Sequence, residues 1–299
     1  MKIFAIVVTY NGMRWYDRCF GSLRDSELPV ETIVIDNASK DETVSYIKEC
    51  FPEICLIESK ENLGFAKANN IGMRYALDHD ADYVFLLNQD AWVEKDTLTK
   101  LMQTFEDNEN VGISSPIHLN GDYSGVDFGF VNCIPVNAVS DAVMNKIQKY
   151  YCVPVVNAAA WLLSAKCLRT VGGFDTLLFV HYGEDNNYCQ RLMYHKLKLV
   201  INTSCTICHD REFRSGQDEI VYRNQLYDKN NMFFRLKYAN INDDYNFSKL
   251  RRQQIKHLFK SILKFSIMRS VSIFRKNMKD FTIIEKSRKL NKIGGCVWL

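Results

Sequence analysis

The sequence predicts an α/β protein with a mainly parallel sheet flanked by helices, followed by a basic, helical C-terminal extension. Three observations support this prediction. Apolar runs of strand length alternate with helix-like stretches along the first two thirds of the chain. Polar residues follow directly after several of these runs. Residues 249–299 hold 14 Lys and Arg against 2 Asp and Glu, whereas residues 1–248 hold 24 against 33.

Length and composition agree with this class. The chain has 299 residues, of which 47% are apolar and 24% charged, as is typical of a soluble globular protein with a buried core. Disordered, collagenous and small disulfide-rich proteins are thereby excluded. The ten cysteines are scattered, and the apolar run at the N-terminus is too short for a signal peptide or a membrane span. We therefore expect a cytoplasmic protein with reduced thiols.

Strand and helix patterns alternate in the order expected for βαβ units. The apolar or β-branched runs that predict strands are residues 2–9, 32–36, 54–59, 83–88, 111–116, 160–164 and 197–201. The intervening stretches that predict helices are residues 12–24, 41–50, 65–78, 96–106, 165–171 and 184–194. Residues 121–156 show no helical period and predict either a hairpin or a mobile loop. Right-handed βαβ units then give a parallel sheet covered on both faces.

Polar side chains gather where the first, second and fourth of these strands end. The three strand ends read Thr9-Tyr10-Asn11, Asp36-Asn37-Ala38-Ser39 and Asn88-Gln89-Asp90. In open α/β sheets, ligands bind at the carboxyl ends of the strands. Ser39 and the nearby Asp41 are explained as caps of the next helix, whereas Asp36 and Asp90 would be held at strand tips. We therefore predict a polar cleft at this edge.

Two common phosphate-binding motifs are absent from the sequence. It contains neither G-x-G-x-x-G nor G-x-x-x-x-G-K-[ST], which argues against dinucleotide-dependent dehydrogenases and P-loop ATPases. A divalent cation is another way to hold a diphosphate, because Mg²⁺ or Mn²⁺ binds carboxylate and phosphate oxygens together. Asp90 suits this ligand position. A single carboxylate supplies too few protein ligands for a metal site, so a second ligand is expected elsewhere in the sequence.

A second polar cluster occupies residues 171–191. It begins with Gly172-Gly173-Phe174-Asp175 and continues through Gly183-Glu184-Asp185 to Arg191. Acidic residues in the first turn of a helix complement its dipole, which is one explanation for the Glu-Asp pair. Only one of two neighbouring side chains faces inward, however, and Asp185 with Arg191 is the plausible inward pair. A carboxylate within hydrogen-bond reach of a hydroxyl can accept its proton, which makes Asp185 a candidate general base.

Five motifs, taken in order, resemble family 2 glycosyltransferases, which have the GT-A fold, and in particular their rhamnosyltransferase-like members. They are Val7-Val8-Thr9-Tyr10-Asn11, Val34-Ile35-Asp36-Asn37-Ala38-Ser39-Lys40-Asp41, Glu61-Asn62-Leu63-Gly64-Phe65 continuing to Asn69-Asn70-Ile71-Gly72, Leu86-Leu87-Asn88-Gln89-Asp90, and the Gly172–Asp175 and Gly183–Asp185 pair. The resemblance spans residues 1 to about 215. We therefore expect a GT-A domain over residues 1–215 and a helical, basic extension over residues 216–299.

The resemblance implies a role for each matching position. The donor nucleotide would be bound by residues of the first four motifs, namely Thr9, Tyr10, Asn11, Asp36, Asn62, Gly64, Phe65, Asn70 and Asn88. Asp90 occupies the position of the last acid in the family's metal-binding D-x-D motif, and Asn88 stands at the position of its first acid. His209 is the expected second metal ligand. Asp185 matches the general base. Contacts with the acceptor are expected from Trp161, Glu184 and Arg191.

The implied function is that of a metal-dependent inverting hexosyltransferase. It would move a sugar from a nucleoside-diphosphate sugar, such as dTDP-rhamnose or a UDP-sugar, to a saccharide or lipid-linked glycan in cell-surface polysaccharide synthesis. Two alternatives stay open: another nucleotide-sugar-binding protein such as a nucleotidyltransferase, and an inactive, membrane-docked scaffold. The first would be expected to carry a Gly-rich loop after its first strand, and the intact Asp36, Asp90 and Asp185 argue against the second.

The basic tail has a helical pattern of its own. On a helix, one stripe would hold Lys249, Arg252, Lys256, Lys260 and Lys264, and a roughly opposite stripe Ile255, Leu258, Phe259, Ile262 and Phe265. Such a helix can lie on an anionic bilayer, here the inner face of the plasma membrane, or pack its apolar side on the acidic body. Both alternatives stay open. A nucleic-acid partner is not expected, because no recognition module accompanies the charge.

Overall fold

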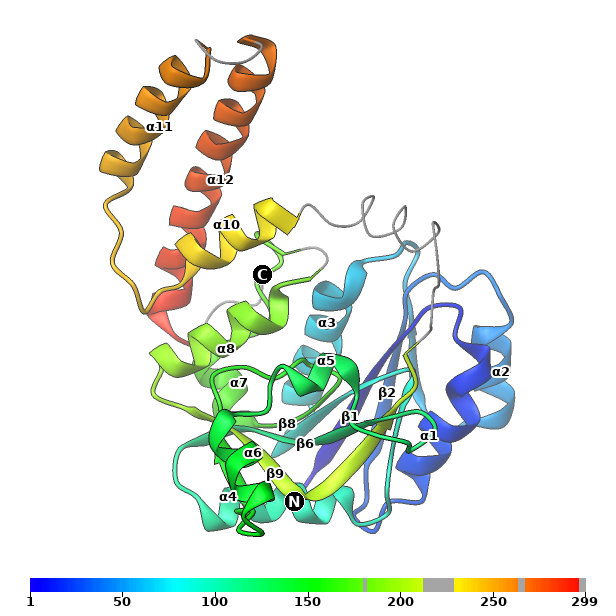
Figure 1. The fold of residues 1–299 in the computed structure, drawn as a ribbon. Helices are drawn as coiled ribbons and strands as arrows, with labels where there is room; N and C mark the ends of the chain where they lie inside the picture. Colours follow the sequence, from blue (N-terminus) through cyan, green and yellow to red (C-terminus); the bar gives the residue numbers. More distant parts are fainter. Residues whose placement is uncertain (180–181, 212–228, 263–266, 296–299) are drawn as a thin grey trace.

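The computed structural model describes residues 1–179, 182–211, 229–262 and 267–295. At its centre is a nine-stranded sheet in the order β3-β2-β1-β4-β8-β6-β9-β5, with β7 beside β9 (Figure 1). The strands are β1 Ile3–Thr9, β2 Glu31–Asp36, β3 Cys55–Glu58, β4 Tyr83–Asn88, β5 Ala91–Val93, β6 Val111–Asn120, β7 Tyr150–Cys152, β8 Ala160–Ser164 and β9 Lys198–His209. Strands β1 to β4 are parallel to one another, and β8 is antiparallel between β4 and β6. The expected mainly parallel sheet is confirmed, and the structure shows that it is mixed, because β8 and β5 pair with their neighbours in the antiparallel sense.

Helices cover both faces of this sheet. The helices of the body are η1 Met13–Trp15, α1 Tyr16–Arg24, α2 Thr43–Cys50, α3 Gly64–Asp78, α4 Thr97–Asp107, α5 Phe128–Val131, α6 Val136–Val143, α7 Ala165–Val171 and α8 Glu184–Tyr194. Along β1, Ala5 and Val7 pack with α1, α2 and α4, whereas Phe4 and Ile6 pack with α3, α7 and α8. Because both faces are buried, the strand reads as a continuous apolar run rather than an alternating one.

The region that showed no helical period contains regular structure. Helices α5 and α6 and strand β7 lie within residues 121–156, in place of the expected hairpin or mobile loop. Helix α6 has no buried residue, and its Val136 is 86% exposed. Val136, Val139 and Val143 are spaced as on one face of a helix, but α6 is only eight residues long, which is shorter than the window over which a helical period is recognised in a sequence.

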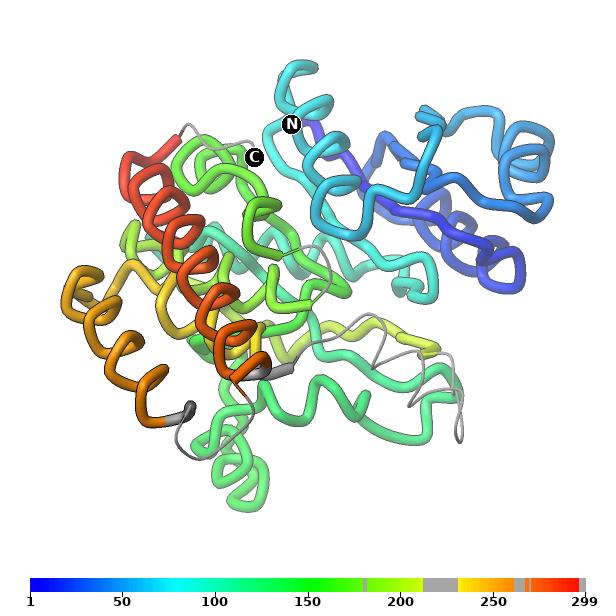
Figure 2. The backbone as a smooth tube through the Cα atoms, turned by 90° about the horizontal axis from the view of Figure 1, so that it is seen from above, coloured from blue at the N-terminus to red at the C-terminus, as the bar shows by residue number. Residues whose placement is uncertain are grey.

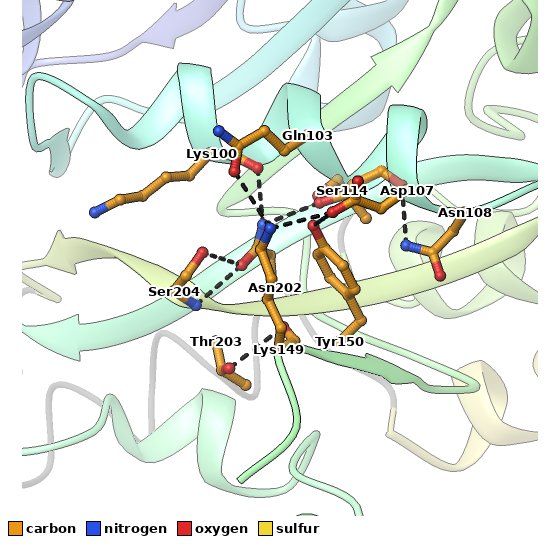
Figure 3. A network of polar contacts seen from close by, with 11 residues as sticks. Lys100, Gln103, Asp107, Asn108, Ser114, Lys149, Tyr150, Asn202, Thr203 and Ser204 are labelled. Atoms are coloured by element: carbon orange, nitrogen blue, oxygen red, sulfur yellow. Dashed lines mark hydrogen bonds and ion pairs between the residues drawn. The ribbon is translucent and has the colours of Figure 1, made fainter.

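Strand β9 is longer than the expected residues 197–201 and continues to His209. Its pairing with β6 shifts after Asn202, so that Ile117 lies opposite Thr206. Asn202 holds this irregularity: its amide nitrogen donates to the Lys100 carbonyl oxygen at 2.8 Å, and its side-chain oxygen accepts from the Ser204 N–H at 2.9 Å (Figure 3). The polar residues of the shift interrupt the apolar run, which hid the second half of the strand.

The C-terminal helices are α10 Lys229–Ala239, α11 Phe247–Ile262 and α12 Ile267–Ile293. Figure 2 shows α11 and α12 on the side of the molecule away from β2 and α2. Leu178 and Phe179 of the body form one apolar cluster with residues of α10, α11 and α12, including Phe281. Part of the basic tail therefore packs on the body. The expected domain boundary at residue 215 lies outside the described residues.

Helix α12 also reaches the body through buried polar contacts. The fully buried Asp175 accepts hydrogen bonds from Ser287 and from Asn291 of this helix. No described helix combines the length and the apolar character needed to cross a bilayer.

Candidate active site

Two adjoining cavities lie at the carboxyl ends of β1, β2 and β4. The first has a volume of about 280 Å³ and is lined by Val8, Asn37, Asn62, Gly64, Phe65, Leu87, Asn88, Gln89 and Asp90. The second has a volume of about 290 Å³ and is lined by Phe65, Asn88, Asn157, Ala158, Ala159, Tyr182, Glu184, Asp185, His209 and Arg211. Phe65 and Asn88 line both cavities. The polar cleft expected at this sheet edge therefore has two neighbouring compartments.

The tip of β2 is stabilised by hydrogen bonds to its carboxylate. Thr9 Oγ1 donates to Asp36 Oδ1 at 3.0 Å, and the Ser39 N–H donates to Oδ2 at 3.0 Å. Asp36 is 2% exposed, and these bonds hold the turn that leads into α2. Thr9 is fully buried and its hydroxyl is used by Asp36, and its binding to the donor nucleotide stays a prediction. A contact between Asp36 and the base stays a prediction.

Tyr10 and Asn11 connect the end of β1 to the neighbouring strand ends. The Tyr10 N–H donates to Gln89 Oε1 at 2.8 Å, and the Asn11 N–H donates to Ser39 Oγ at 3.0 Å. The Tyr10 side chain is 43% exposed. Their binding to a donor stays a prediction.

The loop before α3 forms one wall of the first cavity. Asn62 Oδ1 accepts from the Gly64 N–H at 2.9 Å, and Asn37 Oδ1 accepts from the Leu63 N–H at 2.9 Å. Gly64 has a φ of +77°, a conformation that favours glycine. These contacts place Phe65 where the two cavities meet.

Asn70 has a different role from the expected one. Its side chain is buried and forms two hydrogen bonds with the backbone of Phe174, at 2.7 Å and 2.9 Å. It thereby joins α3 to the Gly172–Asp175 turn. This use of its polar atoms differs from the expected binding of Asn70 to the donor nucleotide, which stays a prediction.

Asp90 and His209 come together at the end of the sheet. Strand β5, which follows Asp90 directly, pairs with β9 so that Ala91 lies opposite His209. As a result, His209 Nε2 lies 3.3 Å from Asp90 Oδ1 and 3.4 Å from Asn88 Nδ2. An imidazole nitrogen and a carboxylate oxygen are both suitable ligands for Mn²⁺.

The pair is an incomplete metal site by itself. The described part of the chain contains no group of three or more Asp, Glu, His and Cys side chains that could hold a metal. Mg²⁺ characteristically takes one or two carboxylates and completes its coordination with substrate phosphates and water. The residues present therefore fit an ion that binds together with a diphosphate.

Asp127 lies behind His209 and was not found from the sequence. Its Oδ2 is 3.7 Å from His209 Nδ1 and accepts from Arg211 Nε at 2.6 Å. Asp127 is 2% exposed and also caps α5 by accepting from the Phe130 N–H. The 3.7 Å between Asp127 Oδ2 and His209 Nδ1 is longer than a hydrogen bond, and His209 Nδ1 has no hydrogen-bond partner among the described residues. A carboxylate that reaches hydrogen-bond distance from the second ring nitrogen can orient a metal-binding imidazole. The only sequence signal was a helix-capping pattern in a region without apolar periodicity.

The second cavity holds two neighbouring carboxyl groups at the start of α8. Asp185 is half-buried, and its Oδ1 accepts from the Asn186 N–H at 2.7 Å. Glu184 is 8% exposed, and its Oε2 has no hydrogen-bond partner among the described residues. Burial, and then the charge of Asp185, raises the pKa of Glu184, and burial raises the pKa of Asp185. A raised pKa makes Asp185 a stronger proton acceptor than an ordinary aspartate.

Arg191 and Trp161 do not reach either cavity. Arg191 is fully buried, and its guanidinium donates to the Gly173 carbonyl oxygen at 2.7 Å. It thereby stabilises the turn after α7. Trp161 is also fully buried and packs between Phe174 and Tyr188. The expected acceptor contacts of both residues, and the pairing of Asp185 with Arg191, are wrong. Polar side chains of Asn157 and Tyr182 line the second cavity instead.

Comparison with known proteins agrees with this geometry. The sequence model of Glycosyl transferase family 2 matches residues 4–127. The chain is 26% identical over 210 residues to the dTDP-rhamnosyl transferase RfbF of Shigella flexneri, which covers 70% of this chain and 69% of that protein. It is also 26% identical over 171 residues to a low-salt glycan biosynthesis hexosyltransferase of Haloferax volcanii, covering 54% of this chain and 52% of that protein.

Solved structures share the fold at lower sequence identity. A mannosyltransferase of Pyrobaculum calidifontis, in complex with GDP-Man and Mn²⁺, aligns with a TM-score of 0.55 and 17% identity over 99% of this chain and 76% of that one. TarS of S. aureus, in complex with UDP-GlcNAc, aligns with a TM-score of 0.57 and 15% identity over 98% and 91%. With the family match over residues 4–127 and the strand-end motifs, these likenesses show that the chain has the GT-A fold and is similar to family 2 glycosyltransferases.

Proposed function

We propose that this protein is a metal-dependent inverting hexosyltransferase that transfers a sugar from a nucleoside-diphosphate sugar to a hydroxyl of a saccharide or lipid-linked glycan. One observation carries the proposal: the cavity that holds Asp185 adjoins the cavity that holds Asp90, with Phe65 and Asn88 between them. The nucleotide would occupy the first cavity and the acceptor the second. The reacting carbon would then lie where they meet.

In the proposed mechanism, Asp185 accepts the proton of the acceptor hydroxyl. The hydroxyl oxygen forms a bond to the anomeric carbon as the bond to the diphosphate oxygen breaks on the opposite face, which inverts the anomeric centre. Positive, oxocarbenium-like character develops on the sugar ring during this step, as in other glycosyl chemistry. The buried surroundings that raise the pKa of Asp185 favour its role as the proton acceptor.

Asp90 and His209 are the residues that would hold Mg²⁺ or Mn²⁺. A bound divalent ion stabilises the negative charge that develops on the leaving diphosphate. Asp127 would orient the His209 ring from behind, and Arg211 pairs with Asp127. The crystallised mannosyltransferase named above contains Mn²⁺, which supports a metal of this kind.

The identities proposed for the donor and the acceptor are inferred from similarity to other glycosyltransferases. The relationship to a dTDP-rhamnosyl transferase favours dTDP-rhamnose, and the neighbour crystallised with UDP-GlcNAc favours a UDP-sugar as the second choice. We place the reaction in the assembly of cell-surface polysaccharide at the cytoplasmic face of the membrane.

Purified protein would be incubated with dTDP-, UDP- and GDP-sugars, with and without Mn²⁺, and slow donor hydrolysis would be measured. We expect Mn²⁺-dependent hydrolysis of one donor class. Asp185→Asn should abolish transfer to an acceptor while donor affinity, measured by calorimetry, stays within a few-fold of wild type. Undiminished transfer by Asp185→Asn would refute its assignment as the base. Binding without turnover would favour the inactive scaffold, and release of pyrophosphate from a nucleoside triphosphate would favour a nucleotidyltransferase.

A further inference from the structure

We propose that the hairpin formed by α11 and α12 binds the surface of an anionic phospholipid bilayer through its outer end. The outer end comprises exposed apolar residues of both helices, Ile255, Phe259, Ile267, Met268 and Ile273, together with the surrounding Lys and Arg. This inference rests on the proposed function, because membrane binding would bring the enzyme to a lipid-linked acceptor.

The apolar residues of the hairpin change from buried to exposed along its length. Near the body, Phe281 and Ile284 are fully buried in the cluster with Leu178 and Phe179. Toward the outer end, Phe259 is 66% exposed and Met268 is 84% exposed. Helix α11 ends at Ile262 and α12 begins at Ile267, so these two side chains belong to the same end of the hairpin, which projects from the body (Figure 1).

The charge of the outer part of the hairpin is of one sign. Residues 247–279 include ten Lys and Arg and no Asp or Glu. The first acidic residues of α12, Asp280 and Glu285, lie closer to the body and pair with Arg235 and Arg251. Lys256 and Lys260, and Arg275 on the other helix, are exposed on stretches without any carboxylate. Each such residue near an anionic bilayer adds to its attraction.

The two helices use other residues to contact each other. Asn277 donates to Gln254 at 3.1 Å, and Leu258, one turn further along α11, is half-buried. The expected apolar stripe is therefore divided: Leu258 lies on a more buried side than Phe259. Lys264 and Phe265 of the expected stripes lie outside the described residues, as does the side chain of Ile262. The remaining exposed apolar and basic side chains suit shallow insertion, with lysine ammonium groups at the headgroup level.

The test is cosedimentation of the full-length protein with large vesicles. Vesicles of phosphatidylcholine would be compared with vesicles in which about a third of the lipid is phosphatidylglycerol, a fraction chosen to mimic a strongly anionic leaflet. We expect binding to the anionic vesicles only, falling about tenfold or more in Phe259→Ser/Met268→Ser and in Lys256→Gln/Lys260→Gln. Phe128→Ser, which removes a side chain that is 86% exposed on α5, and Lys166→Gln/Lys198→Gln are the matched controls.

Any of three vesicle results would overturn the proposal. They are no binding of the wild-type protein to anionic vesicles, binding by the hairpin variants equal to that of the wild type, and a loss of binding in the controls equal to that in the hairpin variants. A stable dimer in sedimentation velocity that is lost in Phe259→Ser/Met268→Ser would assign this surface to a second copy of the chain and would also overturn it. Circular dichroism establishes that each variant is folded. Vesicle-free hydrolysis of the nucleotide-sugar should be unchanged in the hairpin variants, so a failure of membrane binding is distinguishable from a failure of the proposed enzymatic function.

Discussion

Removing the partners that α12 offers to Asp175 should destabilise the whole molecule. Asp175 is fully buried; its Oδ1 accepts from the backbone N–H groups of Leu177 and Leu178, and its Oδ2 from Ser287 and Asn291. A hydrogen bond to a charged group contributes about 1.5–3 kcal/mol. The double variant Ser287→Ala/Asn291→Ala removes two such bonds, so we expect the free energy of unfolding to fall by about 3–6 kcal/mol.

The assay is urea denaturation followed by circular dichroism and by tryptophan fluorescence. We expect one transition, coincident by both probes and shifted to lower urea concentration, because α12 and the body share this buried contact. In Ser287→Ala alone, the free energy of unfolding should fall by about half as much. This single variant should therefore remain folded even where the double variant does not. Ser272→Ala, at an exposed position of the same helix, is the control and should change little.

A loss below about 1 kcal/mol in the double variant would refute this reasoning, since it would fall short of a single such bond. Two separate transitions in the wild-type protein would refute it in another way, by showing that the C-terminal helices fold independently of the sheet. Because the segment that begins at Asp175 leads into α8, we also expect donor hydrolysis to fall in the variants.

Three further predictions concern the cleft. Asp90→Ala should weaken Mn²⁺ and donor binding together, as measured by calorimetry, because it removes the only carboxylate within 4 Å of His209 Nε2 among the described residues; unchanged Mn²⁺ affinity would contradict this. Asp127→Asn should lower Mn²⁺ affinity by about 10–100-fold, the usual cost of losing a group that orients a metal ligand, whereas Asp122→Asn, an exposed change nearby, should not. Glu184→Gln should become more stable relative to wild type as the pH rises from 5 to 8. The reason is that burial raises the pKa of Glu184 in the folded state, so that wild-type stability falls as the pH rises from the ordinary glutamate range through that raised pKa; a pH-independent difference in urea midpoints would show this explanation to be incorrect.

The alternation of strands and helices was predictable because the central strands β1, β2, β4 and β8 are buried on both faces. Thr9, Asp36 and Asn88 are the last residues of such strands and Asp90 lies two residues further on, so the parallel arrangement brings them to one edge of the sheet. The motifs around them indicated the family resemblance before any geometry was known. Helix α6 was missed because it is only eight residues long and its apolar side chains are exposed, so neither its length nor its burial marks it in the sequence.

The orientation of individual side chains was less predictable. Asn70, Trp161 and Arg191 were expected in the cleft on the basis of their motifs or neighbours, and all three are buried in the protein interior. A motif specifies the residue and its element, but the direction of a side chain depends on which partners pack around it. For Arg191 these partners are the carbonyl oxygens of the turn after α7.

The amino-acid sequence by itself therefore determined the fold class, the resemblance to family 2 glycosyltransferases and the sheet edge at which the candidate site lies, because apolar periodicity and strand-end motifs are local properties of the chain. Only the tertiary structure decided that His209 lies beside Asp90, that Asp127 lies behind it, and that Asp175 ties the C-terminal helices to the body. These contacts join residues separated by 82 or more positions, and such pairings arise from strand register and helix packing rather than from any local pattern.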